Sequence, residues 1–482
     1  MTGRFVALRD SLSRRDLSDT GSFWVWWIHP SVIFIAFSIV FGTSIIALTP
    51  PLRAPDEAAH FLRAYGIAQG DIIPSTRDGQ GRKGIFLPAR LYDCFAYFEA
   101  VQAKERKAFG SRAAIEAGPQ HDASVSHNER LPVTFVLYEG SEGYTPVPYL
   151  PYIAAVLIAR LFDLEFTGTL YLMRVAGFAT MTGVLAGAIA LSPFLGWSFL
   201  AISMLPAALY GRAVVSADGA TFAYTLMIIV LCLRGAAGFS IRTRHHALWM
   251  TLCVLSKPPH VVFILLELMQ RPFNTVGRYW RSIALVMLPG LAGSLTWLLI
   301  TAGDVGSWRF VELTGVDAEQ FTLTRKLLFM TEHPLHFPRA VMGTLSNITE
   351  LWRQMVGVLG LFDTVLQPWV YPTVSILVVS SWFTHADTDS TTRTLTAAIT
   401  GLTCAAYCLA IFFISFVAWT PFYADAVWGV QGRYFIPALP LFAILLASLI
   451  HRGPPPGVTA ALAICSALLS GIASVEAILR VG

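Results

Sequence analysis

Two adjacent carboxylates mark the part of the chain whose residues are best suited to chemistry. They lie in the segment TPPLRAPDEAAHFLRAYGIAQG, residues 49–70, directly after a long apolar run. Asp56 and Glu57 are followed by His60 and Arg63, which would share a face with them if the segment is a helix. Such a carboxylate pair can take a proton from a hydroxyl group or bind a divalent cation through its oxygens. The alternative is a solvated charge pair at the end of a helix.

Cationic residues elsewhere in the chain suit a phosphate ligand. Arginine binds phosphate in a bidentate manner and lysine as a point charge, and Arg174, Lys257 and Arg433 all lie near the boundaries of apolar segments. Lys257 precedes two prolines, which predicts a break within its apolar segment. Arg174 and Arg433 could instead be ordinary anchors at the membrane interface. Asp218 and Asp363 also lie near the boundaries of apolar segments, and we add them to the candidates for substrate binding.

The composition predicts an integral membrane protein. Of the 482 residues, 55% are hydrophobic and only 13% are charged, and the mean hydropathy is +0.59. Several apolar windows reach the roughly 20 residues that a bilayer-spanning helix needs. The chain has no basic block interleaved with aromatic residues, so we expect no nucleic-acid partner.

The cysteines show no spacing typical of a metal site or a disulfide framework. Only Cys94 lies in a polar region, and we expect the other five to be buried, inert thiols. These five lie in apolar segments and are Cys232, Cys253, Cys404, Cys408 and Cys465.

Basic residues and apolar runs together predict the topology. Arginines at positions 4, 9, 14 and 15 place the N-terminus in the cytoplasm, and the first apolar run is long enough to remain as an anchor. Later apolar segments lie near 148–163, 169–191, 197–212, 217–233, 247–270, 282–301, 368–384, 395–417, 433–450 and 458–478. We expect a cytoplasmic segment at 1–24, a first transmembrane helix at 25–48, an extracytoplasmic loop with the acidic pair and surface helices at 49–168, a transmembrane bundle at 169–301, a second extracytoplasmic region at 302–367 and a C-terminal transmembrane bundle at 368–482.

Two basic loops, 234–246 and 271–281, should both face the cytoplasm. This requires that segment 146–162, which is short and rich in proline, lie along the outer membrane surface. It also requires that segment 247–270 enter and return as two half-spans, with Lys257 at the outer end of the break. The fold class is then an all-α polytopic membrane protein with about 10–13 membrane helices, including broken or surface helices, and a large first extracytoplasmic loop.

A family resemblance rests on motifs spread over nearly the whole chain. Segment 49–70 is similar to the first-loop motif P-P-x-x-x-P-D-E-x-x-H-x-x-R-A of bacterial membrane proteins grouped as domain of unknown function 2142. Six further motifs follow in the same order, namely YTPVPYLPY, MRVAG, VSADG, SKPP, GLFDTVLQPW and QGRYFIPALP. The motifs add Tyr149, Gln431 and Tyr434 to the candidates for substrate binding.

That family in turn resembles the GT-C superfamily, integral membrane glycosyltransferases that use polyprenyl-phosphate sugars. The resemblance implies that Asp56 and Glu57 match the acidic element near the catalytic centre of GT-C enzymes. It also implies that Arg174 matches a basic residue at the outer start of the second span, and Asp218 an aspartate after the next outer turn. The chain lacks an obvious soluble C-terminal domain, so it looks closer to lipid-sugar or glycan-modifying transferases.

The hypothesis from the sequence is an inverting transfer of a sugar from a polyprenyl-phosphate carrier to a glycan or lipid hydroxyl. The site would face the extracytoplasmic side of the bacterial cytoplasmic membrane, among membrane lipids. Asp56 would be the base or a metal ligand with Glu57 as its partner, and no cofactor is expected beyond a possible divalent cation on these two acids.

The remaining candidates would bind substrate. Arg174, Lys257 and Arg433 would hold the carrier phosphate, while His60 and Arg63 would orient the carboxylates or bind the acceptor. Three alternatives stay open: a transporter or flippase for a lipid-linked saccharide, a glycan polymerase or ligase with a diphosphate-linked donor, and a non-enzymatic assembly partner.

Overall fold

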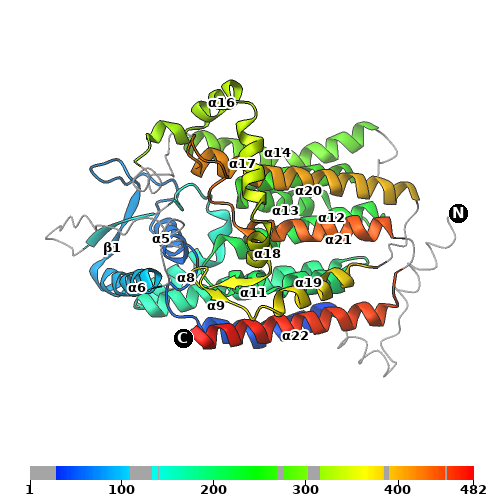
Figure 1. Ribbon diagram of the computed structural model, residues 1–482, viewed down its shortest axis with the longest axis horizontal. Helices are drawn as coiled ribbons and strands as arrows, with labels where there is room; N and C mark the ends of the chain where they lie inside the picture. Colours follow the sequence, from blue (N-terminus) through cyan, green and yellow to red (C-terminus); the bar gives the residue numbers. More distant parts are fainter. Residues whose placement is uncertain are drawn as a thin grey trace.

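The computed structural model describes residues 29–108, 133–138, 140–269, 276–301, 315–384, 390–450 and 453–481. The predicted cytoplasmic segment 1–24 lies outside these residues, and so does part of the basic loop 271–281. Long helices lie side by side along the long axis of the molecule (Figure 1). The chain is therefore a multi-pass membrane protein built from helices, as the sequence predicted. Which end of the bundle faces the cytoplasm stays a prediction.

Seven helices among the described residues are long and apolar enough to cross a bilayer, and three shorter apolar helices accompany them. The first span, Pro30–Leu48, comprises α3 (Pro30–Phe37), the π-helical turn η1 (Ser38–Gly42) and α4 (Thr43–Leu48). The others are α9 (Phe166–Leu191), α12 (Ala217–Ala236), α14 (Val276–Thr301), α20 (Ser390–Trp419), η5 (Gly432–Ala438) continued by α21 (Leu439–Leu449), and α22 (Pro456–Val481).

Helix α12 is the centre of the bundle. The most apolar window of this helix is 94% buried, far more than the windows of the other spans. A helix that is apolar all round is expected to be enclosed by other helices. Asp218 lies in the first turn of α12 and Cys232 lies near its last turn. Both side chains are therefore held at opposite ends of one rigid, enclosed element.

The predicted break at Lys257 is confirmed. Helix α13 (Thr243–Ser256) ends one residue before it, and the 3₁₀ helix η3 (Pro258–Met269) begins one residue after it. Lys257 itself is extended, with φ −153° and ψ 146°, as expected for a residue before proline. His246 near the start of α13 lies 2.8 Å from Glu267 near the end of η3, measured from Nε2 to Oε1. The segment therefore enters the bundle and returns to the same end.

The apolar segment near 197–212 is not a single helix. The chain forms two short helices there, α10 (Gly196–Ser203) and α11 (Pro206–Ala213). Leu205 leaves the helical region, with φ −49° and ψ 139°, because a following proline disfavours helix in the residue before it. The break lets α11 turn toward the end of the bundle that carries Asp218.

The first-loop region is a folded unit at one end of the bundle (Figure 1). It contains α5 (Glu57–Ala68), β1 (Gly84–Pro88), α6 (Ala89–Ala108), β2 (Val133–Leu137), η2 (Val147–Tyr149) and α8 (Leu150–Leu161). Strands β1 and β2 pair antiparallel, which the all-α prediction did not include. Phe61 of α5 packs against Phe166 of α9, with ring centroids 5.1 Å apart. Aromatic packing of this kind joins the region to the bundle.

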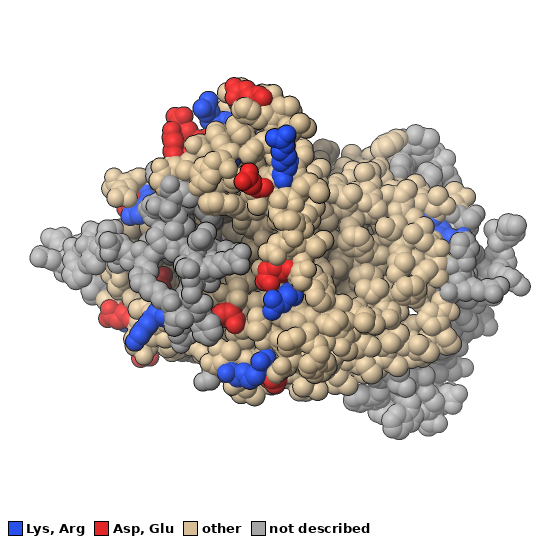
Figure 2. All heavy atoms as spheres, in the orientation of Figure 1, with Lys and Arg blue, Asp and Glu red and all other residues tan. Residues whose placement is uncertain are grey.

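A second region follows α14 and continues to the next apolar helix. Its elements are η4 (Ala318–Phe321), α16 (Leu323–Glu332), α17 (His336–Leu345), α18 (Ile348–Gly357), the two-residue strands β3 (Val358–Leu359) and β4 (Thr364–Val365), and α19 (Val370–Ser381). On the face shown in Figure 2, charged side chains gather over this region and the first-loop region, whereas the long helices are almost uniformly uncharged there. This separation is expected if lipid covers the bundle.

Three of the five cysteines expected to be buried are buried, namely Cys232, Cys253 and Cys404. Cys408 is only partly buried and Cys465 is exposed, so the expectation is wrong for Cys465. It lies on the apolar helix α22, where exposure to lipid is compatible with a hydrophobic thiol.

The contact between α8 and α9 predicts which glycine tolerates a side chain. A Cβ atom on Gly177 would lie 2.2 Å from Cε1 of Tyr152, whose hydroxyl donates to the carbonyl of Ser216 at 3.0 Å. We expect Gly177→Ala to lower the free energy of unfolding by about 1–3 kcal/mol. The matched control is Gly183→Ala on the same helix, where a Cβ meets nothing within 4 Å. Thermal unfolding of both variants in detergent measures the difference, and equal midpoints would contradict this packing.

Candidate functional site

Asp56 occupies an unusual backbone conformation at the start of α5. Its φ is 58° and its ψ is 16°, in the left-handed region. Aspartate tolerates this region better than most residues, and such conformations recur at functional sites. The Asp56 side chain is 37% exposed, and its Oδ2 accepts a hydrogen bond from Nη2 of Arg433 at 2.9 Å. The turn thus presents a partly solvated carboxylate that is already paired with a cation.

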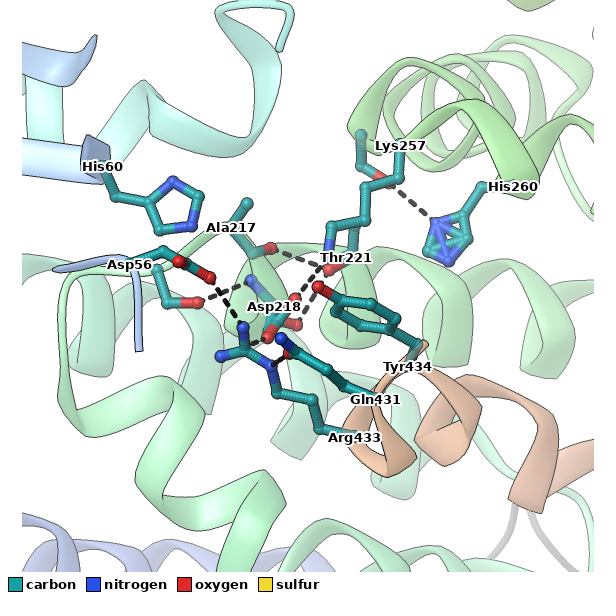
Figure 3. A network of polar contacts seen from close by, with 12 residues as sticks. Asp56, His60, Ala217, Asp218, Thr221, Lys257, His260, Gln431, Arg433 and Tyr434 are labelled. Carbon is teal, nitrogen blue, oxygen red and sulfur yellow. Dashed lines mark hydrogen bonds and ion pairs between the residues drawn. The ribbon is translucent and has the colours of Figure 1, made fainter. Parts of the chain in front are cut away.

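Four charged residues from four separate parts of the chain meet at this point, and we call them the charge network: Asp56, Asp218, Lys257 and Arg433 (Figure 3). Nη1 of Arg433 lies 3.3 Å from Oδ2 of Asp218. The ammonium group of Lys257 donates to the other oxygen, Oδ1, of the same aspartate. Asp218 therefore holds both cations, and Arg433 connects it to Asp56.

Neighbouring residues fix the two cations in place. Oε1 of Gln431 accepts a hydrogen bond from Nε of Arg433 at 2.7 Å. The ammonium nitrogen of Lys257 lies 4.7 Å from the ring centroid of Tyr434 and 5.8 Å from that of Tyr144, within the range of cation–π attraction. Four of the residues that the sequence suggested for substrate binding therefore lie together in the structure: Lys257, Gln431, Arg433 and Tyr434.

The structure separates the two adjacent acids. Glu57 turns away from the charge network and forms a bidentate pair with Arg174, with oxygen–nitrogen distances of 2.8 and 2.7 Å. Both side chains are fully buried. Arg174 also donates to the carbonyls of Thr49 and Pro50, and Oε1 of Glu57 accepts the backbone N–H of Val215 at 3.0 Å. This closed arrangement favours a structural role over the catalytic and phosphate-binding roles predicted from sequence.

His60 lies behind the charge network as a neutral side chain. Its Nδ1 lies 2.7 Å from the hydroxyl of Tyr149, and both residues are buried. Burial lowers the pKa of His60 to about 4, although Asp56 and Asp218 act in the opposite direction. The imidazole therefore carries no charge near neutral pH and supports Tyr149 rather than pairing with a carboxylate.

Arg63 binds backbone carbonyls of the first-loop region. Its Nη1 donates to the carbonyl of Asp71 at 3.0 Å, and Nη2 donates to that of Tyr144 at 3.1 Å. Burial lowers the pKa of the Arg63 guanidinium. Because one of these contacts fixes the segment that carries Tyr144, Arg63 positions a wall of the site instead of entering the charge network.

Asp363 lies beside the charge network, in the turn between β3 and β4. Its Oδ2 accepts from Nη2 of Arg53 at 3.0 Å, and its Oδ1 accepts the backbone N–H of Leu361 at 3.1 Å. The preceding residue, Phe362, presents its ring to Arg433 at 5.3 Å. The turn therefore contributes an aromatic surface to the site, while the carboxylate of Asp363 holds Arg53.

Sequence reasoning missed three contributors: Arg53, Tyr144 and Phe362. Each lies inside one of the motifs quoted above, so motif membership was the available signal. Nothing in residue type separated Tyr144 from Tyr149, or Phe362 from the acid beside it. Their roles depend on which elements pack against them.

Comparisons with known proteins identify a family. The family model described as predicted membrane protein (DUF2142) matches residues 39–442. This match includes every residue of the charge network, and the chain belongs to this family. No curated protein and no solved structure matches the chain.

The buried ion pair of Glu57 and Arg174 predicts a large loss of stability when one partner is neutralised. Glu57→Gln leaves the guanidinium of Arg174 buried without its counter-charge, which is expected to cost about 3–5 kcal/mol. The control is Glu350→Gln, because Glu350 pairs with Arg353 at 3.3 Å with both side chains 37% exposed. An exposed pair contributes at most about 1 kcal/mol. Thermal unfolding in detergent distinguishes the two, and a stable Glu57→Gln protein would exclude the structural role.

The buried imidazole predicts a pH dependence of stability. The pKa of His60 is about 4 in the folded state and about 6.5 when unfolded, so the unfolded chain binds more protons between these values. Stability should therefore fall as the pH is lowered from about 6.5 toward 4, with this residue contributing up to about 1.4 kcal/mol per pH unit.

Unfolding midpoints measured across this pH range test the assignment. His60→Gln should flatten the dependence, whereas His333→Gln, which changes an exposed histidine, should leave it unchanged. Identical slopes for the wild type and His60→Gln would show that the imidazole is solvated or charged.

Proposed function

We propose that this chain is a glycosyltransferase that moves a sugar from a polyprenyl-phosphate carrier to a hydroxyl of a glycan or lipid. We further propose that it acts at the extracytoplasmic side of the bacterial cytoplasmic membrane, with its N-terminus in the cytoplasm. The observation that supports this most is the charge network. It combines a partly exposed carboxylate on Asp56 with two anchored cations at the end of a membrane bundle.

The two cations suit the charge change of such a reaction. A polyprenyl-phosphate sugar is a phosphodiester with one negative charge, and the departing polyprenyl phosphate is a monoester with up to two. Cations held in place before the reaction therefore favour the transition state over the bound donor. Asp218 keeps Lys257 and Arg433 together, and Gln431 orients the guanidinium. We therefore assign binding of the donor phosphate to Lys257 and Arg433.

The proposed step is a direct displacement. The acceptor hydroxyl oxygen attacks the anomeric carbon while the bond from that carbon to the phosphate oxygen breaks. The bonding electrons leave with the phosphate, and the hydroxyl proton passes to the carboxylate of Asp56. Attack opposite to the leaving phosphate inverts the configuration of the sugar. His60 and Tyr149 support the wall behind Asp56.

A divalent cation shared by Asp56 and Glu57 does not fit this arrangement. Both carboxylate oxygens of Glu57 are bound to Arg174, in a fully buried pair. Glu57 could reach a metal only if this pair opened and Arg174 lost its counter-charge. The proposed reaction therefore uses the cationic side chains in place of a metal on these two acids.

The proposal predicts that Asp56→Asn abolishes transfer without loss of folded protein. Asparagine keeps the left-handed turn but does not accept the proton. Asp163→Asn is the matched control, since Asp163 also has a positive φ, of 54°, and pairs with Arg90 at the surface. In a strain lacking the chromosomal gene, the lipid-linked sugar donor should accumulate with Asp56→Asn and return to the wild-type level with Asp163→Asn.

Mass spectrometry of lipid extracts measures the donor, and immunoblots of membranes measure the protein. Normal donor turnover by Asp56→Asn at equal protein level would exclude the catalytic assignment. An assay in vesicles that contain the purified protein and the extracted donor distinguishes a transferase from a transporter. A transporter moves the intact lipid between leaflets, whereas a transferase breaks the sugar–phosphate bond.

A further inference from the structure

A second cluster of reactive side chains lies near the end of α12 that is remote from the charge network. It consists of Cys232 on α12, His246 on α13 and Glu267 on η3, all buried. Sγ of Cys232 lies 3.4 Å from Nε2 of His246 and 3.8 Å from Oε1 of Glu267. Nε2 of His246 lies 2.8 Å from the same Oε1. A thiol, an imidazole and a carboxylate thus direct one donor atom each to a common point.

These separations are close to those in a tetrahedral zinc site. Zinc bonds of about 2.3 Å to sulfur and about 2.0–2.1 Å to nitrogen or oxygen place neighbouring ligand atoms roughly 3.3–3.6 Å apart. The contacts of Cys232 at 3.4 and 3.8 Å already lie near this range. Only the contact between His246 and Glu267, at 2.8 Å, must open, by roughly half an ångström on this geometry.

The charges of the three groups also match a divalent ion. A buried carboxylate is costly unless it is paired and fully hydrogen-bonded. A doubly charged cation bound by a thiolate, a carboxylate and a neutral imidazole forms an assembly with no net charge. Binding releases the thiol proton to solvent. The metal would thus convert a buried polar cluster into a neutral one.

We propose that Cys232, His246 and Glu267 bind a divalent transition-metal ion of the zinc class. The ion connects α12, which carries Asp218, to α13 and η3, which lie on either side of Lys257. Asp218 and Cys232 are separated by 14 residues of one helix, or about 21 Å at 1.5 Å per residue. The ion is therefore too far away to contact a substrate in the charge network. Its role is structural, and the proposal does not depend on the proposed function.

Metal content tests the site directly. The probe is Zn²⁺ added to protein purified in detergent and then removed by desalting, with bound metal measured by mass spectrometry. We expect one equivalent in the wild type and its loss in Cys232→Ala. Cys253→Ala is the control because Cys253 is also buried, but it lies next to Thr225 instead of the cluster. It should retain the full equivalent.

Cobalt substitution gives a second test, read from the absorption spectrum instead of the metal content. Co²⁺ bound to a thiolate and an imidazole in tetrahedral geometry produces a sulfur-to-metal charge-transfer band and intense visible bands. The wild type should show both, and Cys232→Ser should lose the charge-transfer band. Absence of stoichiometric zinc and of the cobalt bands in the wild type would overturn the proposal. It would identify the cluster as a metal-free polar contact among Cys232, His246 and Glu267.

Discussion

The buried ion pair between Glu57 and Arg174 is the interaction on which the geometry of the site depends. It joins the start of α5 to α9, and through the backbone N–H of Val215 it also holds the segment that leads into α12. Asp56 precedes Glu57 directly, and Asp218 follows Val215 by three residues. One fully buried pair therefore determines where both acids of the charge network lie. Removing a pair of this kind is costly because each partner would remain buried without its counter-charge.

The charge network itself is balanced, with two carboxylates and two cations. Asp218 and the cations that bind it are mostly buried, whereas Asp56 is more exposed. This gradient gives the two acids different environments. The buried acid keeps Lys257 and Arg433 positioned, and the exposed acid is the one that an acceptor can approach. Such division of roles by environment is common where two carboxylates share a site.

The break at Lys257 positions side chains at both ends of the bundle. Because Pro258 and Pro259 end α13, the chain reverses and its lysine lies at the turn, beside Asp218 (Figure 3). The return brings Glu267 back to His246 and Cys232 at the other end. The same reversal therefore places Lys257 in the proposed active site and Glu267 in the proposed metal site. Both places are held by contacts among α12, α13 and η3.

The sequence alone determined the membrane class, the broken segment at Lys257 and the list of residues that form the charge network. These follow from local properties, namely apolar length, proline geometry and residue type. Only the tertiary structure decided that Glu57 and Arg174 close on each other while Asp56 turns toward Arg433, a residue 377 positions away. It also decided that Cys232 meets His246 and Glu267, which no sequence spacing indicates. Pairing of distant side chains depends on how helices pack, and packing is not encoded in any local pattern of residues.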